Sequence, residues 1–178
     1  VVVLSNLILK INFMDKENSE EKKDSQAQAD RIVNLVLDNH LVFRNQYNEV
    51  FISINVDGHY ENWPIKSSKI KKWLAKEYWD EYIKVPNNES LKNAMNVIEG
   101  RAFNSYRYEL NNRVSFQNEV IWYDLTNDDW SVVKVDSNGW EIKAHSPILF
   151  QRYSHQKPQV LPEKDGDTDG SVIIRLIS

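Results

Sequence analysis

Helical and strand-like patterns follow one another along this chain in an order that restricts the fold to one class. A helical pattern comes first, followed by three strand-like runs, two more helical patterns and five further strand-like runs. Strands that alternate singly with helices would predict a parallel sheet, and that alternation is missing here. Short connections between successive strands favour antiparallel pairing. The order therefore predicts an α+β fold, with an antiparallel sheet and about three helices segregated to one side.

Three segments have the periodicity and the capping residues of helices. They cover about 26–38, 67–83 and 87–103. Ser25 opens a Ser-x-x-Gln capping box before the first, Ser67 can cap the second, and Asn87 or Asn88 can cap the third. The residues expected on the buried faces of the second and third helices are Ile70, Leu74, Tyr78, Tyr82, Leu91, Ala94, Met95, Ile98 and Ala102.

The strand-like runs are rich in β-branched and aromatic residues. Within the run 50–56, the β-branched residues Val50, Ile52, Ile54 and Val56 alternate with Phe51, Ser53 and Asn55, as expected of a strand with two different faces. Asp57–Gly58 separates two such runs and is a strong hairpin signal, because both residues tolerate positive φ. The expected strands cover 41–45, 50–56, 59–65, 106–110, 120–125, 130–135, 140–143 and 148–153.

The ends of the chain differ in composition from its middle. Residues 1–24 are expected to be an N-terminal extension, in which Met14 is the expected biological start and residues 1–13 are upstream translation or a cloning remnant. An edge strand is the alternative for residues 1–13. Residues 25–155 are expected to form a single α+β domain, and residues 156–171 have the composition of a linker. Five of the last seven residues, 172–178, are apolar and are expected to begin a following element.

Composition excludes several classes of function. The 178-residue chain has no cysteine, which excludes disulfide scaffolds, zinc sites with sulfur ligands and cysteine nucleophiles. None of the familiar glycine-rich phosphate loops occurs, and the four histidines lack metal-ligand spacing. The apolar run 1–13 is too short to span a bilayer. We therefore expect a cytoplasmic protein that has no bound cofactor, no metal and no membrane partner.

The second predicted helix carries a basic and aromatic surface opposite its apolar face. Lysines can contact phosphates, and tryptophans beside them offer planes on which unpaired bases can stack. The candidate nucleic-acid-binding residues are Lys66, Lys69, Lys72, Lys76, Trp73 and Trp79. The alternative is a solvated helix face on which Asp80 reduces the positive charge and the two tryptophans complete the core. The net charge of −4 gives no independent reason to expect nucleic-acid binding.

Two further patterns suggest metal chemistry and are each weaker than their structural alternatives. Residues 165–170, DGDTDG, match the first half of a calcium-binding loop, but Leu176 stands where a bidentate glutamate is needed, so an acidic linker is the preferred interpretation. Asp124, Glu141 and Lys143 have the loose spacing of a Mg²⁺-dependent nuclease. Alternation along a strand also produces an exposed Glu-x-Lys pair without any catalytic role.

Several short motifs between Ala29 and Tyr153 together resemble a known region. They are Phe43-Arg44, Trp63-Pro64-Ile65-x-Ser67, Trp73-Leu74 with Tyr78, Leu91 with Asn96-Val97-Ile98-Glu99-Gly100-x-Ala102, and Tyr123-Asp124-Leu125 with Trp130, Val133-x-Val135 and Gly139-Trp140. This pattern resembles the N-terminal region that precedes the P-loop ATPase domain of phage- and plasmid-associated primase–helicase-like proteins. The resemblance implies a neighbouring ATPase domain and no catalytic residue within this chain, since no Walker motif or primase carboxylate triad is present.

The expected function is therefore a non-catalytic accessory domain of a mobile-element DNA replication ATPase. It would position nucleic acid, as single-stranded or junction DNA, or the downstream ATPase domain. A stand-alone protein-interaction module is one alternative, and a Mg²⁺-dependent nuclease is another. Salt dependence separates the first two, because phosphate binding weakens steeply with salt and an apolar interface does not.

Overall fold

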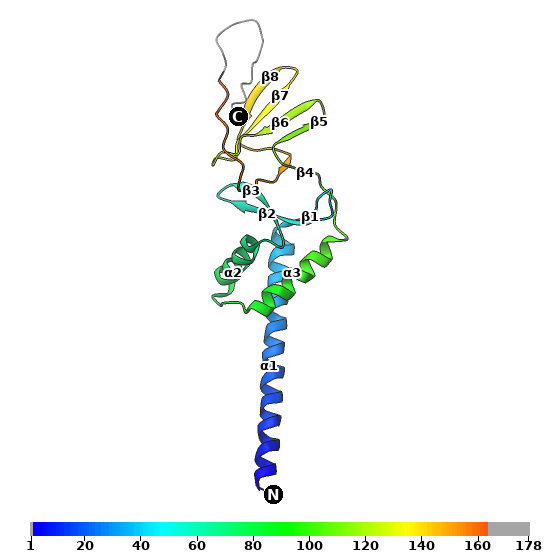
Figure 1. Ribbon diagram of the computed structural model, residues 1–178, viewed down its shortest axis with the longest axis vertical. Coiled ribbons are helices and arrows are strands. Elements are labelled where there is room, and N and C mark those ends of the chain that lie inside the picture. Colours follow the sequence, from blue (N-terminus) through cyan, green and yellow to red (C-terminus); the bar gives the residue numbers. More distant parts are fainter. Residues whose placement is uncertain (1, 164–178) are drawn as a thin grey trace. The chain divides into compact units, whose positions relative to one another are not determined.

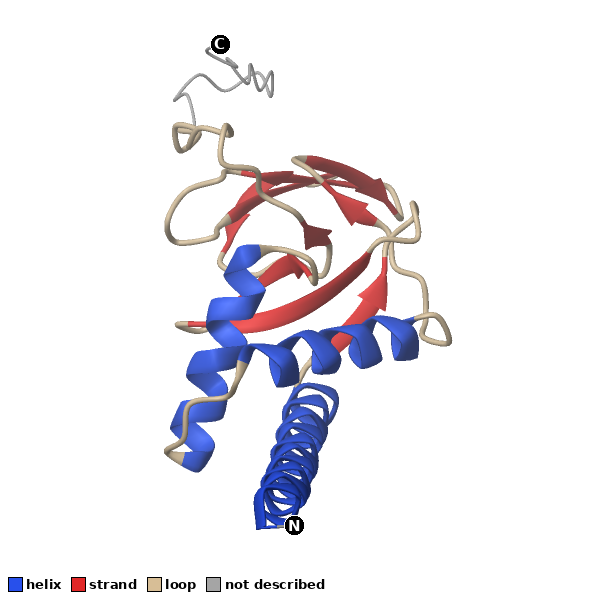
Figure 2. Cartoon of the chain, turned by 60° about the horizontal axis from the view of Figure 1, so that its bottom comes forward, coloured by secondary structure: helices blue, strands red, loops and turns tan. Residues whose placement is uncertain are grey.

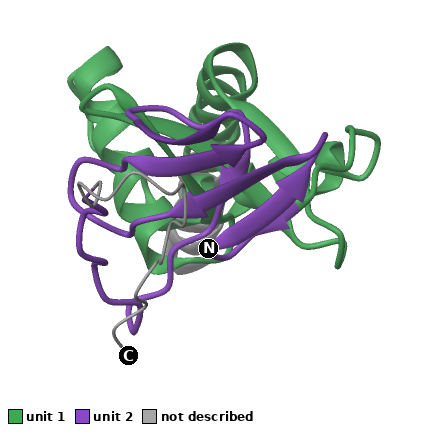
Figure 3. Cartoon of the chain, turned by 90° about the horizontal axis from the view of Figure 1, so that it is seen from above, with its two compact units in different colours: residues 1–109 green, residues 110–178 purple. Residues whose placement is uncertain are grey.

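The computed structural model describes residues 2–163, with side chains from residue 19 onward. The chain divides into two compact units, unit 1 (Val1–Glu109) and unit 2 (Leu110–Ser178), which Figure 3 colours separately. The boundary lies inside the range 25–155 that the sequence pattern assigns to one domain. Each unit has its own hydrogen-bonded sheet or sheets. The helices and antiparallel sheets confirm the α+β class.

The first helix is much longer than the sequence pattern predicts. Helix α1 spans Val2–Asn39 as one continuous element (Figure 1). The expected start near residue 26 is therefore wrong, as is the edge-strand alternative for residues 1–13. The chain contains no glycine or proline before Gly58, so nothing in the polar stretch after Met14 breaks a helix that its many Glu and Lys residues favour. Ser25 lies buried inside α1, and its carbonyl oxygen accepts a 2.8 Å hydrogen bond from Ser90 Oγ.

Unit 1 contains a three-stranded antiparallel sheet in the order β1–β2–β3. The strands are β1 (Leu41–Arg44), β2 (Val50–Val56) and β3 (His59–Pro64), in close agreement with the predicted ranges. Asp57 (φ 49°) and Gly58 (φ 93°) form the β2–β3 hairpin, so the predicted turn is confirmed. In the register, Ile52 stands between Val42 and Trp63.

The second and third helices begin and end close to where the capping residues predict. Helix α2 spans Ser68–Tyr82 and helix α3 spans Asn88–Ala102. The Ser67 hydroxyl accepts a hydrogen bond from the Ile70 backbone N–H (3.2 Å), and Asn87 Oδ1 accepts one from the Ser90 N–H (2.7 Å). Each side chain satisfies a donor that the first helical turn leaves without an internal partner.

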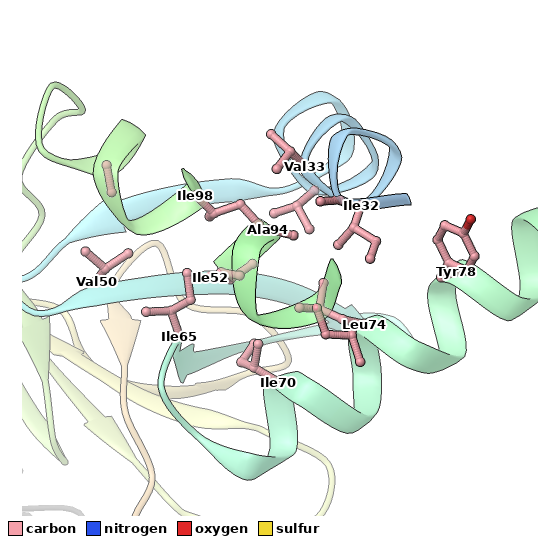
Figure 4. Packing of buried hydrophobic residues seen from close by; sticks show 14 of the residues in the cluster. Ile32, Val33, Val50, Ile52, Ile65, Ile70, Leu74, Tyr78, Ala94 and Ile98 are labelled. Carbon is pink, nitrogen blue, oxygen red and sulfur yellow. The ribbon is translucent and has the colours of Figure 1, made fainter. Parts of the chain in front are cut away.

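The core of unit 1 lies between the three helices and one face of the β1–β2–β3 sheet. Figures 1 and 2 place α1, α2 and α3 on the same side of that sheet. Side chains from every helix meet the alternating residues of β2, as Figure 4 shows. The central members of this cluster are Ile32, Val36, Ile52, Ile54, Ile70, Leu74, Tyr78, Ala94 and Ile98. The predicted buried faces of α2 and α3 are confirmed, with Tyr82 and Met95 partly buried at the edge.

Unit 2 is built from short strands. Strands β5 (Val114–Gln117), β6 (Val120–Asp124), β7 (Val132–Asp136) and β8 (Gly139–Lys143) form an antiparallel sheet in sequence order. Strand β4 (Leu110–Asn111) pairs with β9 (Leu149–Phe150) in parallel, which corrects the expectation of antiparallel pairing throughout. The predicted strand 106–110 is also wrong: it is reduced to Leu110 and one isolated bridge between Arg107 and Arg44. The sequence pattern missed β5.

One face of the β5–β8 sheet is entirely apolar. The register aligns two rows across the four strands: Val114, Tyr123, Val133 and Ile142 in one, and Phe116, Ile121, Val135 and Trp140 in the other. Val114, Phe116, Ile121 and Ile142 remain exposed, and Phe116 is 70% exposed.

Within the described part of the chain, no helix combines the length and the apolarity needed to cross a bilayer.

Candidate nucleic-acid interface

Helix α2 presents its lysines on the side opposite the core. Ile70, Leu74 and Tyr78 are buried, so the remaining turns of the helix face outward. Lys72, Lys76 and Trp79 follow one another at i, i+4 and i+7 and therefore share one stripe. The indole of Trp79 is 47% exposed. This stripe puts two lysines and one exposed tryptophan on the same side of the helix.

Three of the predicted lysines are held by carboxylates. Lys66 Nζ lies 2.7 Å from Glu99 Oε1, and Lys69 Nζ lies 2.7 Å from Glu61 Oε2. Lys76 Nζ lies 2.6 Å from Asp80 Oδ2, so Asp80 reduces the positive charge of the helix as the alternative interpretation expects. Among the side chains of residues 19–163, neither Lys72 nor its neighbour Lys71 forms an ion pair. A phosphate can therefore bind these two lysines of α2 without displacing a carboxylate.

Lys69 belongs to a compact cluster with strand β3. Its ammonium lies 3.8 Å from the centroid of the Trp63 ring, and Glu61 Oε2 also accepts a 2.6 Å hydrogen bond from Trp63 Nε1. Burial raises the pKa of Glu61, but the hydrogen bonds from Lys69 and Trp63 outweigh it and hold that pKa below its usual value. Lys69 is therefore anchored to its own fold, which makes it the least available of the predicted phosphate ligands.

The two tryptophans of α2 differ in exposure. Trp73 is partly buried against the core of unit 1, and its ring meets His40 edge-on at 4.9 Å between centroids. The same burial lowers the pKa of His40. Trp73 thus acts as a core residue, whereas Trp79 remains available for stacking. The sequence pattern placed both at the borders of the lysine face and could not separate them.

The residues proposed for a nuclease do not form a metal site. Asp124 is opposite Val132 on β7, and Val132 is opposite Lys143 on β8, so Asp124 and Lys143 are two strands apart, about 10 Å. Glu141 Oε2 lies 2.8 Å from Lys143 Nζ, and Glu141 also pairs with Lys134 at 3.4 Å. No group of three His, Cys, Asp or Glu side chains in the described residues could hold a metal ion. This geometry gives the nuclease alternative no support.

Asp124 has a structural role that the sequence pattern did not reveal. Asp124 is 1% exposed. The Arg152 guanidinium donates a hydrogen bond to each of its carboxylate oxygens, from Nε to Oδ2 (2.9 Å) and from Nη2 to Oδ1 (2.5 Å). Arg152 Nη1 also donates to the carbonyl of Asn127 (2.6 Å), and the guanidinium carbon lies 3.7 Å from the centroid of the Trp130 ring. Asp124 and Arg152 are 28 residues apart in the sequence, so no short-range sequence pattern predicts that they pair.

The acidic run 165–170 and the apolar run 172–178 lie outside the described residues, so the acidic-linker interpretation, its calcium-loop alternative and the expected following element stay predictions. Comparison with protein-family models, curated proteins and solved structures gives no match.

Proposed function

We propose that this chain is a non-catalytic accessory domain that binds nucleic acid through helix α2 of unit 1. The observation that carries the proposal is the stripe of Lys72, Lys76 and Trp79, together with the unpaired neighbour Lys71. Cations beside an exposed indole provide both contacts that unpaired nucleic acid needs, one for phosphate and one for a base.

The ion pairs on this surface do not prevent phosphate binding. Exposed ion pairs such as Lys76–Asp80 contribute little to stability because water and salt screen them, so a phosphate can replace the carboxylate at low cost. Lys69 differs because it is also packed on Trp63. We therefore assign the main electrostatic contribution to Lys71 and Lys72, with Lys76 and Lys66 in support.

The proposed setting is a mobile-element DNA replication protein with a P-loop ATPase domain. Support for this setting comes from the resemblance of the scattered motifs between Ala29 and Tyr153 to the region that precedes such a domain. In this setting the chain holds single-stranded or junction DNA, or the motor domain itself, and leaves catalysis to the ATPase.

Reversing the charge of Lys71 and Lys72 together should weaken binding of a labelled single strand by about tenfold in fluorescence anisotropy at low salt. The slope of log Kd against log salt should also fall by about 1.4, because two phosphate contacts are lost. The matched control is Lys22→Glu with Lys23→Glu, a second pair of adjacent exposed lysines, on α1. Equal effects of the two double variants would contradict a specific role for α2, and no binding by the native protein at about 50 μM would overturn the proposed function.

Protein interaction is a second candidate, favoured by the exposed apolar face of β5–β8. Two aligned rows of uncharged side chains cross this face, and four of their members are exposed: Val114, Phe116, Ile121 and Ile142. Contiguous apolar surface of this kind marks protein interfaces more often than phosphate contacts. A partner that binds this face should show little dependence on salt, whereas the nucleic-acid complex should weaken steeply.

A further inference from the structure

A second basic and aromatic surface lies in unit 1 beside the edge of β1. The segment that follows α3 passes along this edge, where the Tyr108 backbone N–H donates to the Arg44 carbonyl (2.9 Å) and the Arg44 N–H donates to the Tyr106 carbonyl (3.5 Å). Arg107 forms a parallel bridge with Arg44. Tyr108 fixes the segment further, because its ring meets buried Phe43 edge-on at 5.6 Å. A short backbone ladder thus positions side chains from residues 103–108.

Two arginines of this surface, Arg44 and Arg107, donate hydrogen bonds to uncharged groups. Arg44 Nη2 donates to the carbonyl of Ser105 (3.3 Å), and its guanidinium carbon lies 6.0 Å from the centroid of the Phe103 ring. Arg107 Nη2 donates to Asn48 Oδ1 (2.6 Å), which links the segment to the β1–β2 turn. In the part of the chain with described side chains, none of Arg44, Arg101 and Arg107 forms an ion pair. Their positive charge is therefore uncompensated by direct contact, unlike that of Lys66, Lys69 and Lys76.

Aromatic rings stand exposed among these arginines. Tyr106 is 83% exposed, and Phe103 and Tyr47 are also largely exposed. Two carboxylates lie in the same stretches: Glu49 accepts a 2.8 Å hydrogen bond from Asn45, and Glu109 is exposed. Arginine suits such a place because its planar group both stacks on aromatic rings and binds phosphate in a bidentate manner.

We propose that this arginine–aromatic surface, formed by Arg44, Tyr47, Phe103, Tyr106 and Arg107, binds a single-stranded nucleic acid by stacking its bases and contacting its phosphates. The inference rests on the nucleic-acid-binding function proposed above and names the strand form. A duplex keeps its bases stacked on one another and offers this surface only phosphates, so exposed rings add affinity only for unpaired bases. Tyr106 is the principal stacking residue, and Arg107 is the principal phosphate contact.

Replacing Tyr106 with alanine should separate base stacking from phosphate binding. We expect Tyr106→Ala to weaken binding of labelled oligo(dT) by about tenfold in anisotropy, and to leave binding of an abasic strand of equal length unchanged. Arg107→Gln should weaken both strands and lower the salt slope by about 0.7. The matched control is Tyr60→Ala, which removes another exposed tyrosine of unit 1, on β3.

Each outcome has a distinct meaning. If the native protein binds neither strand, the proposed function fails and this inference fails with it. If it binds oligo(dT) but Tyr106→Ala behaves like Tyr60→Ala, or weakens the abasic strand equally, only the stacking role of this surface is overturned. Duplex of the same length bound as tightly as oligo(dT) would also overturn it. Binding of oligo(dT) that is insensitive to salt would overturn the phosphate contacts.

Discussion

Replacing Arg152 with alanine should lower the free energy of unfolding of unit 2 by about 3–5 kcal/mol. The substitution leaves the Asp124 carboxylate, which is 1% exposed, without its two strongest hydrogen bonds. It also removes the cation that lies over Trp130 and the donor to the Asn127 carbonyl. An uncompensated buried charge costs far more than an exposed ion pair contributes, and this asymmetry sets the size of the effect.

Urea unfolding followed by tryptophan fluorescence and by circular dichroism measures this change. The matched control is Lys143→Ala, which breaks the exposed Lys143–Glu141 pair of the same sheet and should lower the free energy of unfolding far less than Arg152→Ala. The double variant Asp124→Leu with Arg152→Met should be more stable than Arg152→Ala, because it removes both charges together. A loss below about 1 kcal/mol for Arg152→Ala would contradict a structural role for the pair.

The second large effect is expected at the centre of unit 1. Ile98→Ala should destabilise the unit by about 2–5 kcal/mol, because the side chain is 0% exposed and lies among residues from all three helices and β2. Its neighbour Val97 is 48% exposed on the outer side of α3, so Val97→Ala should change stability by less than about 0.5 kcal/mol. Thermal and urea unfolding of the two variants compare them directly. Equal losses would contradict the placement of the helix faces seen in Figure 4.

Local signals predicted the parts of the fold that depend on local chemistry. Ser67 and Asn87 cap their helices as expected, because a capping side chain bonds only a few residues ahead. The Asp57–Gly58 turn follows from the positive φ that both residues tolerate. The alternation of Val50, Ile52 and Ile54 similarly identified the core face of β2.

The predictions from the sequence were wrong where contacts between distant residues, or the absence of helix-breaking residues, determine the structure. Ser25 resembles a helix start, yet α1 runs through it because its neighbours also favour helix. The Ser25 side chain is buried, and its hydroxyl lies 3.2 Å from Ser90 Oγ on α3. The parallel pairing of β4 with β9 joins segments that are far apart in sequence, and two-residue strands have no periodicity.

The candidate site shows the same division. The outward face of α2 was predictable from helical periodicity, and Trp79 is exposed as a binding role requires. The contacts of Lys69 with Glu61 and Trp63 depend on how α2 packs against β3. This packing cannot be predicted from the spacing of residues in the sequence. The arginine–aromatic surface depends on an isolated bridge between β1 and the segment after α3.

The most direct test of nucleic-acid binding by unit 1 is a ¹⁵N–¹H NMR titration of the whole chain with oligo(dT) at low salt. We expect the backbone amide signals of residues 66–80 and 103–108 to shift progressively as the oligonucleotide is added. The signals of the apolar rows on β5–β8 should stay unchanged. Shifts confined to β5–β8, or no shifts at oligonucleotide concentrations of about 1 mM, would contradict nucleic-acid binding by unit 1.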